Sequence, residues 1–167
     1  MSMPIARVAA LAGSLPALWL LAVALEVLIG GAAVWLAGRH GPALVAVLVN
    51  LLVGLRFAVT LRPGRVPLIT RYARCDPAGL PLRAEAYTRG LTVLWAWLLG
   101  LFALAHAAAT ADAWSTVAVA NLQAGLCAAL FLSEHELRSR RFRELGRATP
   151  WRTLRAIRAA AGAPHGA

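Results

Sequence analysis

The most regular feature of this chain is a series of long apolar blocks separated by short polar stretches. Two blocks cover residues 15–37 and 42–61, and two more cover residues 91–110 and 113–132. Folded as an α-helix, each block would be roughly 30–34 Å long, which is about the thickness of the hydrocarbon core of a bilayer. The blocks show no alternation of apolar and polar residues with a period of two, which the strands of a membrane barrel would have. The pattern therefore predicts four membrane-spanning helices.

The connections between the blocks predict an all-α membrane protein made of two helical hairpins. Residues 38–42 (GRHGP) join the first two helices, and a polar break around Asp112, a candidate N-cap, joins the last two. A long loop, residues 62–90, separates the hairpins. Residues 1–14 precede the transmembrane domain of residues 15–132, and residues 133–167 form a tail after it.

Arginine decides the predicted orientation, because the chain contains no lysine. Of the 17 arginines, 15 fall in the N-terminal segment, the long loop and the tail, whereas Arg39 lies on the opposite side. The positive-inside rule therefore places both termini in the cytoplasm and predicts a multi-pass membrane protein. Because topology accounts for the net charge of +10, this charge is no argument for a nucleic-acid partner.

Five polar residues inside the predicted helices are candidates for contacts within the membrane: Glu26, Asn50, Arg56, Asn121 and Gln123. Such groups are costly in lipid and normally face protein. In an antiparallel first hairpin, Glu26 comes within about one helical turn, in depth, of Asn50 and Arg56. An ion pair between Glu26 and Arg56 would lock the hairpin, unless Arg56 reaches the inner headgroups or Glu26 binds a proton, cation or headgroup. Asn121 and Gln123 cannot share one narrow face, so at least one should contact another helix or subunit.

The search for catalytic chemistry is mostly negative. No nucleophile elbow and no HExxH pattern occurs. Cys75 and Cys127 form no CxxC or His/Cys cluster, so we expect no disulfide, metal or cofactor. His106, near the outer end of the third helix, is expected to be exposed or bonded to its own helix. The sequence thus favours a protein without enzymatic activity over an enzyme.

The segment SEHE, residues 133–136, places acidic residues and a histidine where the fourth predicted helix ends. Neighbours on a helix point about 100° apart, so Glu134 and His135 do not predict a catalytic dyad. We expect Glu134 and Glu136 to pair with arginines one turn later, namely Arg138, Arg140 and Arg141.

The tail contains an amphipathic pattern at about residues 150–161. Thr149 is a candidate N-cap and Pro150 a first helical residue. Apolar and basic residues then repeat at spacings of three, as Trp151, Leu154 and Ile157 and as Arg152, Arg155 and Arg158. Such a helix suits an anionic inner leaflet, or alternatively docks an acidic soluble protein.

Three segments also resemble a known family: PLITRYAR (67–74), YTRGLTVLWAWLLG (87–100) and ANLQAGLCAALFLSEHELRSRRF (120–142). Together they are similar to an uncharacterised family of small bacterial inner-membrane proteins, found in gene clusters for aryl polyene pigments of the xanthomonadin type and for fatty-acid-like products. Gly90 and the pair Gln123-Ala124 depart from the family pattern. The residues that carry the resemblance are Pro67, Thr70, Arg71, Arg74, Tyr87, Thr88, Arg89, Asn121, Phe131, Glu134 and Arg141.

The resemblance implies an accessory or scaffold protein of a lipid-linked biosynthesis pathway. Acyl carrier proteins are generally acidic, so an arginine-rich cytoplasmic face would attract them or other pathway enzymes. The candidate interaction residues are Arg65, Arg71, Tyr72, Arg74, Arg89 and Glu134. Membrane lipids are expected partners, and homo- or hetero-oligomers are left open. The alternatives are an integral membrane acyl or lipid-headgroup transferase and a small proton-coupled transporter that uses Glu26.

Overall fold

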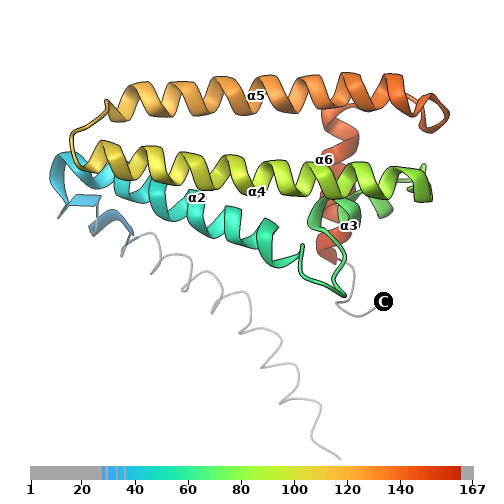
Figure 1. Cartoon of the computed structure of the whole chain (residues 1–167), viewed down its shortest axis with the longest axis horizontal. Helices are drawn as coiled ribbons and strands as arrows, with labels where there is room; N and C mark the ends of the chain where they lie inside the picture. Colours follow the sequence, from blue (N-terminus) through green and yellow to red (C-terminus); the bar gives the residue numbers. More distant parts are fainter. Residues whose placement is uncertain (1–27, 29, 33, 36, 163–167) are drawn as a thin grey trace, which may run out of the picture.

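The computed structural model describes residues 28, 30–32, 34–35 and 37–162, and every regular element in this part is helical (Figure 1). Residues 15–27 of the first predicted helix, Glu26 among them, lie outside the described residues, as do residues 29, 33 and 36. The three long helices are α2 (Gly41–Val59), α4 (Leu82–Thr110) and α5 (Thr116–Arg141). The shorter elements are η1 (Gly38–His40), α3 (Leu68–Arg74), η2 (Arg143–Leu145) and α6 (Pro150–Gly162).

The long helices are apolar mainly on their outside. The most apolar 18-residue windows in the helical stretches Gly38–Val59, Leu82–Thr110 and Thr116–Arg141 have mean hydropathies of 2.1, 1.8 and 1.6. Between 6% and 22% of the residues in these windows are buried within the molecule, so most of their apolar side chains face outward. Among the described residues, these three stretches are long and apolar enough to cross a membrane, which is compatible with a multi-pass membrane protein.

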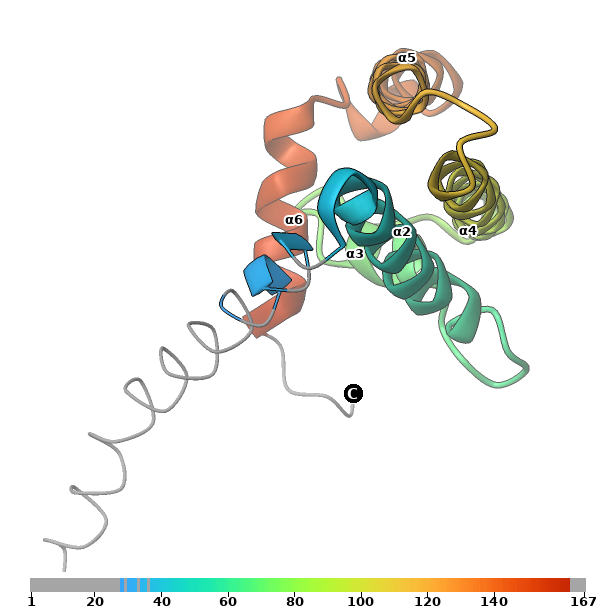
Figure 2. The ribbon, with the colours of Figure 1, turned by 90° about the vertical axis from the view of Figure 1, so that its left-hand side faces the viewer.

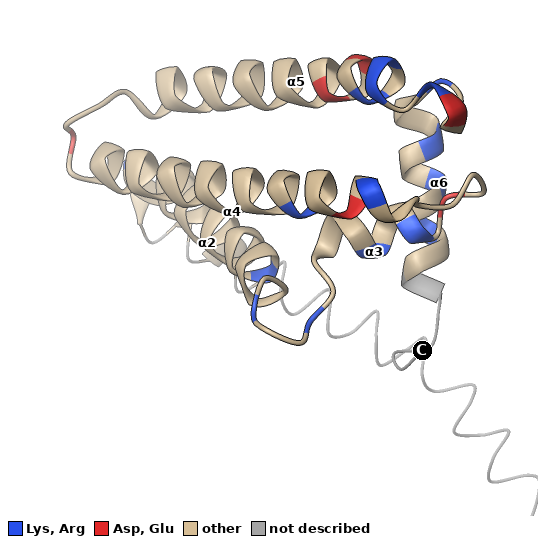
Figure 3. Ribbon diagram, turned by 45° about the vertical axis from the view of Figure 1, so that its right-hand side comes forward, with Lys and Arg blue, Asp and Glu red and all other residues tan. Residues whose placement is uncertain are grey.

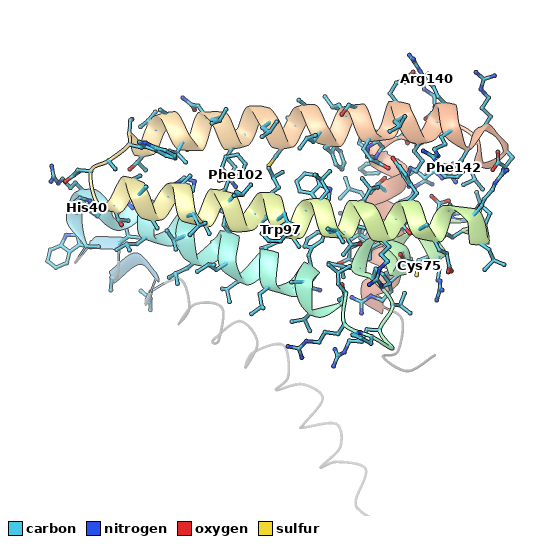
Figure 4. All side chains as sticks on the ribbon, viewed as in Figure 1. His40, Cys75, Trp97, Phe102, Arg140 and Phe142 are labelled. Atoms are coloured by element: carbon cyan, nitrogen blue, oxygen red, sulfur yellow. The ribbon has the colours of Figure 1, made fainter. Side chains whose placement is uncertain are left out.

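The long helices pack through small and aromatic residues. Helices α2 and α4 come close at Gly54, where an added Cβ would lie 3.3 Å from Cβ of Leu99. Helices α4 and α5 share a small core of Leu98, Phe102 and Val119, and Figure 4 shows Phe102 between these two helices. Trp97, by contrast, is 70% exposed on α4. Helix packing therefore uses only part of the surface of each helix, and α4 packs against both α2 and α5.

Helices α4 and α5 extend beyond the apolar blocks. Helix α4 begins at Leu82 rather than at residue 91, and α5 continues to Arg141 rather than ending at residue 132. The added segments are rich in Arg, Glu, Ala and Leu, which favour helix even where they are too polar for lipid. Most of the predicted loop 62–90 is consequently helical, as α3 and the first turns of α4.

The turn between α4 and α5 is capped differently from the prediction. Ser115 is the N-cap of α5, and its hydroxyl accepts a hydrogen bond from the Ala118 N–H at 3.4 Å. Asp112 instead adopts a φ of 56° and pairs with Arg39 of η1 at 2.6 Å. Because Asp112 lies three residues before Ser115, its side chain is placed to join the two turns rather than to cap the helix.

Most described charges lie at the opposite end of the molecule (Figure 3), here called the arginine-rich end. This end comprises α3, α6, the start of α4 and the end of α5. Figures 1 and 2 show that α6 runs across the three long helices rather than along them. Thr149 caps α6 by accepting a hydrogen bond from the Arg152 N–H at 3.3 Å. The arginine-rich end is therefore a folded layer that packs on the ends of the long helices.

Candidate functional site

Threonine hydroxyls hold α3 at the arginine-rich end. The Leu68 N–H donates to Oγ1 of Thr60 at 3.0 Å, and the Ile69 N–H donates to Oγ1 of Thr92 at 3.3 Å. These bonds satisfy N–H groups in the first turn of α3, which no helical carbonyl reaches. Thr70 is bonded to Thr88 of α4 at 2.7 Å between the two Oγ1 atoms. Helix α3 is thus fixed to α4, although it has only seven residues.

A charged pair holds α6 in place. The Arg152 guanidinium donates to both Asp76 carboxylate oxygens at 2.6–2.8 Å and to the Leu145 carbonyl at 2.7 Å. Asp76 is 8% exposed at its side chain and Arg152 is 20% exposed. A bidentate pair of this kind fixes orientation as well as distance. It joins the start of α6 to the turn that follows α3.

A second, exposed pair supports the segment between α5 and α6. Arg83, in the first turn of α4, pairs with Glu144 of η2. The backbone N–H of Glu144 itself and then the Arg83 guanidinium lower the pKa of the Glu144 carboxyl. Because both side chains are largely in solvent, this pair contributes little to stability.

Helices α2, α3, α4, α5 and α6 line an open cleft of about 340 Å³, which is called the cleft from here on. Its apolar walls come from α2, α4 and α5, and its lining near the arginine-rich end comes from α3 and α6. The wall residues are Val53, Phe57, Leu91, Trp95, Leu99 and Phe131. Its polar residues include Tyr72, Glu134, His135, Arg138 and Thr153, while Ala156 and Ile157 add apolar surface from α6. The cleft is therefore apolar over most of its surface and polar at one side.

The polar side of the cleft is a hydrogen-bonded cluster between α5 and α6. His135, 6% exposed at its side chain, is bonded through Nδ1 to the Phe131 carbonyl at 2.7 Å. Its Nε2 is 2.8 Å from Oγ1 of Thr153, and Arg138 donates to that same oxygen at 3.2 Å. Glu134 lies 3.2 Å from Nδ1 of His135 and 3.4 Å from Nε of Arg138. Glu134 thus approaches the His135 ring, although side chains of neighbouring residues on a helix point about 100° apart.

The predicted interaction residues divide into two groups. Tyr72 and Glu134 line the cleft. Arg65, Arg71, Arg74 and Arg89 are exposed. Of these, Arg74 pairs with Glu85 at 2.6 Å, and Arg89 donates to the Leu61 carbonyl at 3.2 Å. Arg65 and Arg71 form no ion pair with the described residues, although the Arg71 guanidinium lies 5.8 Å from the Tyr72 ring centre. These two arginines therefore lie exposed on the surface of the described part of the chain.

The polar residues inside the long helices form a network that the sequence does not predict as a whole. Gln123 of α5 donates to Oδ1 of Asn50 on α2 at 2.9 Å. Oε1 of Gln123 is 2.9 Å from Nε2 of His106 on α4. His106 is only 2% exposed, so it is neither a surface residue nor bonded only within its own helix. Asn121 and Arg56 are exposed.

Several contacts at the arginine-rich end could not be found from the sequence. Thr153 follows His135 by 18 residues and Arg152 follows Asp76 by 76, so no local spacing predicts their contacts. Only the spacing of four from Glu134 to Arg138 and from Glu136 to Arg140 gives a signal, and both ion pairs are present. Within the described residues, no group of three His, Cys, Asp or Glu side chains is arranged to hold a metal ion.

Comparison with protein families, with curated proteins and with solved structures finds no match for this chain.

Proposed function

We propose that this protein is an integral membrane accessory protein that holds a long hydrocarbon chain with a polar head at the cytoplasmic surface. The observation that carries the proposal is the cleft. Hydrocarbon side chains from three long helices line it, and Tyr72, His135, Arg138 and Thr153 supply polar groups on one side. Its volume is within the usual range of small-molecule sites.

The polar side of the cleft would decide which chain binds. A lipid tail already lies in hydrocarbon, so moving it into an apolar cleft gains little from the hydrophobic effect. Preference over bulk lipid must come from the head, through hydrogen bonds and charge. Arg138 and Thr153 suit a carbonyl, ester or phosphate oxygen. An acyl chain with an oxygen-rich head is therefore the ligand class that the cleft supports best.

The surrounding topology follows from the arginines. We take the arginine-rich end as cytoplasmic, with four spans, both termini inside and a bacterial inner membrane as the location. The wide hydrocarbon surface of α2, α4 and α5 and the charged layer at one end support this arrangement. An acyl-binding cleft also fits the aryl polyene or fatty-acid-like pathway that the sequence resemblance implies.

Recruitment of an acidic carrier protein is a second function, favoured by the exposed arginines. Arg62, Arg65 and Arg71 are exposed and form no ion pair with other described residues. Tyr72, the neighbour of Arg71, lines the cleft. A carrier attracted to these arginines would bring its acyl chain close to the cleft. Replacing all three arginines with glutamate should weaken binding of an acidic carrier, measured by surface plasmon resonance at low salt, and unchanged binding would contradict this role.

Photolabelling tests the binding proposal. The full-length protein in lipid nanodiscs is mixed with a diazirine-bearing fatty acid and irradiated, with and without excess unlabelled fatty acid. The mass of the intact protein gives the amount of label. The part of the label that the unlabelled fatty acid prevents is called the competed label. Ile157→Trp should fill the cleft and remove most of the competed label. The matched change on the same helix is Leu154→Trp, at a side chain that is 47% exposed and does not line the cleft. Equal competed labelling of both variants and the wild type would refute the proposal.

A further inference from the structure

The hydrogen bonds of His135 identify which of its nitrogens carries a proton. A carbonyl oxygen only accepts, so Nδ1 must donate to the Phe131 carbonyl at 2.7 Å. In the neutral imidazole, Nε2 then has a lone pair and accepts from the Thr153 hydroxyl at 2.8 Å. The Thr153 hydroxyl is therefore bonded to a base that is held in the correct tautomer.

Two charged groups complete the cluster. Arg138 donates to Oγ1 of Thr153 at 3.2 Å, which favours negative charge on that oxygen. Glu134 lies 3.2 Å from Nδ1 of His135 and would stabilise the imidazolium once Nε2 has taken a proton. A hydroxyl bonded to a base, with the base oriented by a third group, is the arrangement of an activated nucleophile. All four side chains line the cleft.

From this geometry we infer that Thr153 is the nucleophile of an acyl-transfer site, with His135 as its general base. The inference rests on the proposed function, because the acyl chain must lie in the cleft. The substrate class is an activated long-chain acyl group, such as an acyl thioester. Its carbonyl would lie at the polar side, next to Thr153 and the Arg138 guanidinium.

The reaction balances in two steps. Oγ1 of Thr153 attacks the carbonyl carbon and its proton passes to Nε2 of His135. The carbon–sulfur bond then breaks, and the leaving thiolate takes that proton, which leaves a threonine ester and a free thiol. In the second step the oxygen of an acceptor alcohol attacks the ester, its proton passes to Nε2, and Oγ1 leaves and recovers that proton. The acyl group has then moved from sulfur to the acceptor oxygen.

The cluster also joins α5 to α6, so the experiment must measure chemistry rather than stability. The full-length protein in nanodiscs, with Cys75→Ala and Cys127→Ala to prevent thiol exchange, is given the palmitoyl thioester of N-acetylcysteamine. The amount of released thiol is measured with a colorimetric assay, and peptide mass spectrometry locates the acyl adduct. We expect the adduct on Thr153, retained in Thr153→Ser and absent in Thr153→Val.

Two further variants separate base catalysis from packing. His135→Gln keeps a side chain able to hydrogen-bond Thr153 and should slow acylation at least 100-fold, the scale of general-base catalysis. Ser133→Ala is the control, since Ser133 is exposed and its hydroxyl bonds only to the Leu130 carbonyl. It should acylate at the wild-type rate.

The two proposals fail in different ways. Competed photolabelling of the cleft without any adduct or thiol release would overturn the inference and leave the binding function standing. An adduct that persists in Thr153→Val would also overturn it. Loss of competed photolabelling in the wild type would overturn the binding function and this inference with it.

Discussion

Asp76 and Arg152 form the bidentate ion pair that holds the start of α6. Their side chains are largely buried and joined by three short hydrogen bonds. The sequence shows fourteen arginines in the long loop and tail and cannot tell which one finds this carboxylate. Pairs four apart on one helix are predictable because helical geometry brings them together, whereas a contact across 76 residues depends on the whole fold.

Asp76→Asn should loosen α6 from the rest of the molecule. The change leaves the Arg152 charge without its partner, which costs about 2–3 kcal/mol after allowance for the partial exposure of Arg152. Limited proteolysis between α5 and α6 and SDS-induced unfolding in mixed micelles measure the effect. Glu136→Gln, at an exposed pair within α5, is the control and should leave both measurements unchanged. Equal proteolysis of the two variants would be evidence against the anchoring role.

Gln123→Leu should destabilise the contact of α5 with α2 and α4. The change removes bonds to Asn50 and His106 and leaves both buried side chains without that partner. Hydrogen bonds between membrane helices contribute about 0.6–1.7 kcal/mol each, so we expect a loss of about 1–2 kcal/mol in SDS unfolding. Asn121→Leu, two residues away on the exposed side, should be neutral. A loss of the same size in both variants would contradict the network.

At the scale of helices, hydropathy located the long apolar segments but not their ends. The length of an apolar segment reflects the thickness of the hydrocarbon core, whereas a helix ends where its backbone hydrogen bonds end. Helix α5 therefore continues through the polar segment after Leu132, and α4 begins within the predicted loop. This extension brings Glu134, His135 and Arg138 to the cleft.

Gly54→Val should separate α2 from α4. Gly54 is buried, and a Cβ there would already lie 3.3 Å from Leu99, so a branched side chain must push the helices apart. Overpacking of this kind costs about 1–3 kcal/mol in unfolding free energy. Gly125→Val on α5 is the matched change, because nothing lies within 4 Å of a Cβ at that position. If Gly125→Val is as destabilising as Gly54→Val, the close approach is not the cause.

Helix α6 should rest on anionic headgroups with its outer face. Trp151 and Leu154 are 61% and 47% exposed, and Arg155 and Arg158 are exposed beside them. A spin label at Leu154→Cys, in the protein with Cys75→Ala and Cys127→Ala, should become more accessible to oxygen than to a nickel chelate when nanodiscs contain phosphatidylglycerol. A label at Arg140→Cys, on exposed α5, should favour the nickel chelate. Equal behaviour of both labels would leave α6 as a surface for a protein partner.

For the whole molecule, the sequence predicts the class of protein and not its site. The apolar blocks indicate a helical membrane protein, and the described residues contain three helices that are long and apolar enough to cross a membrane. The cleft was beyond prediction because it arises from five elements whose relative positions depend on the threonine contacts of α3 and the Asp76–Arg152 pair. Polar residues with no shared motif thereby come to one side of an apolar space.

The central claim is that an acyl chain occupies this cleft, and mapping the photolabelled positions tests it most directly. Peptides from the protein labelled with the diazirine fatty acid in nanodiscs are sequenced by mass spectrometry, with and without unlabelled competitor. We expect competed label at Trp95 and Phe131, which line the cleft, and uncompeted label at Trp97 and Leu101, which face outward. The same competition at all four positions, or none at Trp95 and Phe131, would contradict the claim.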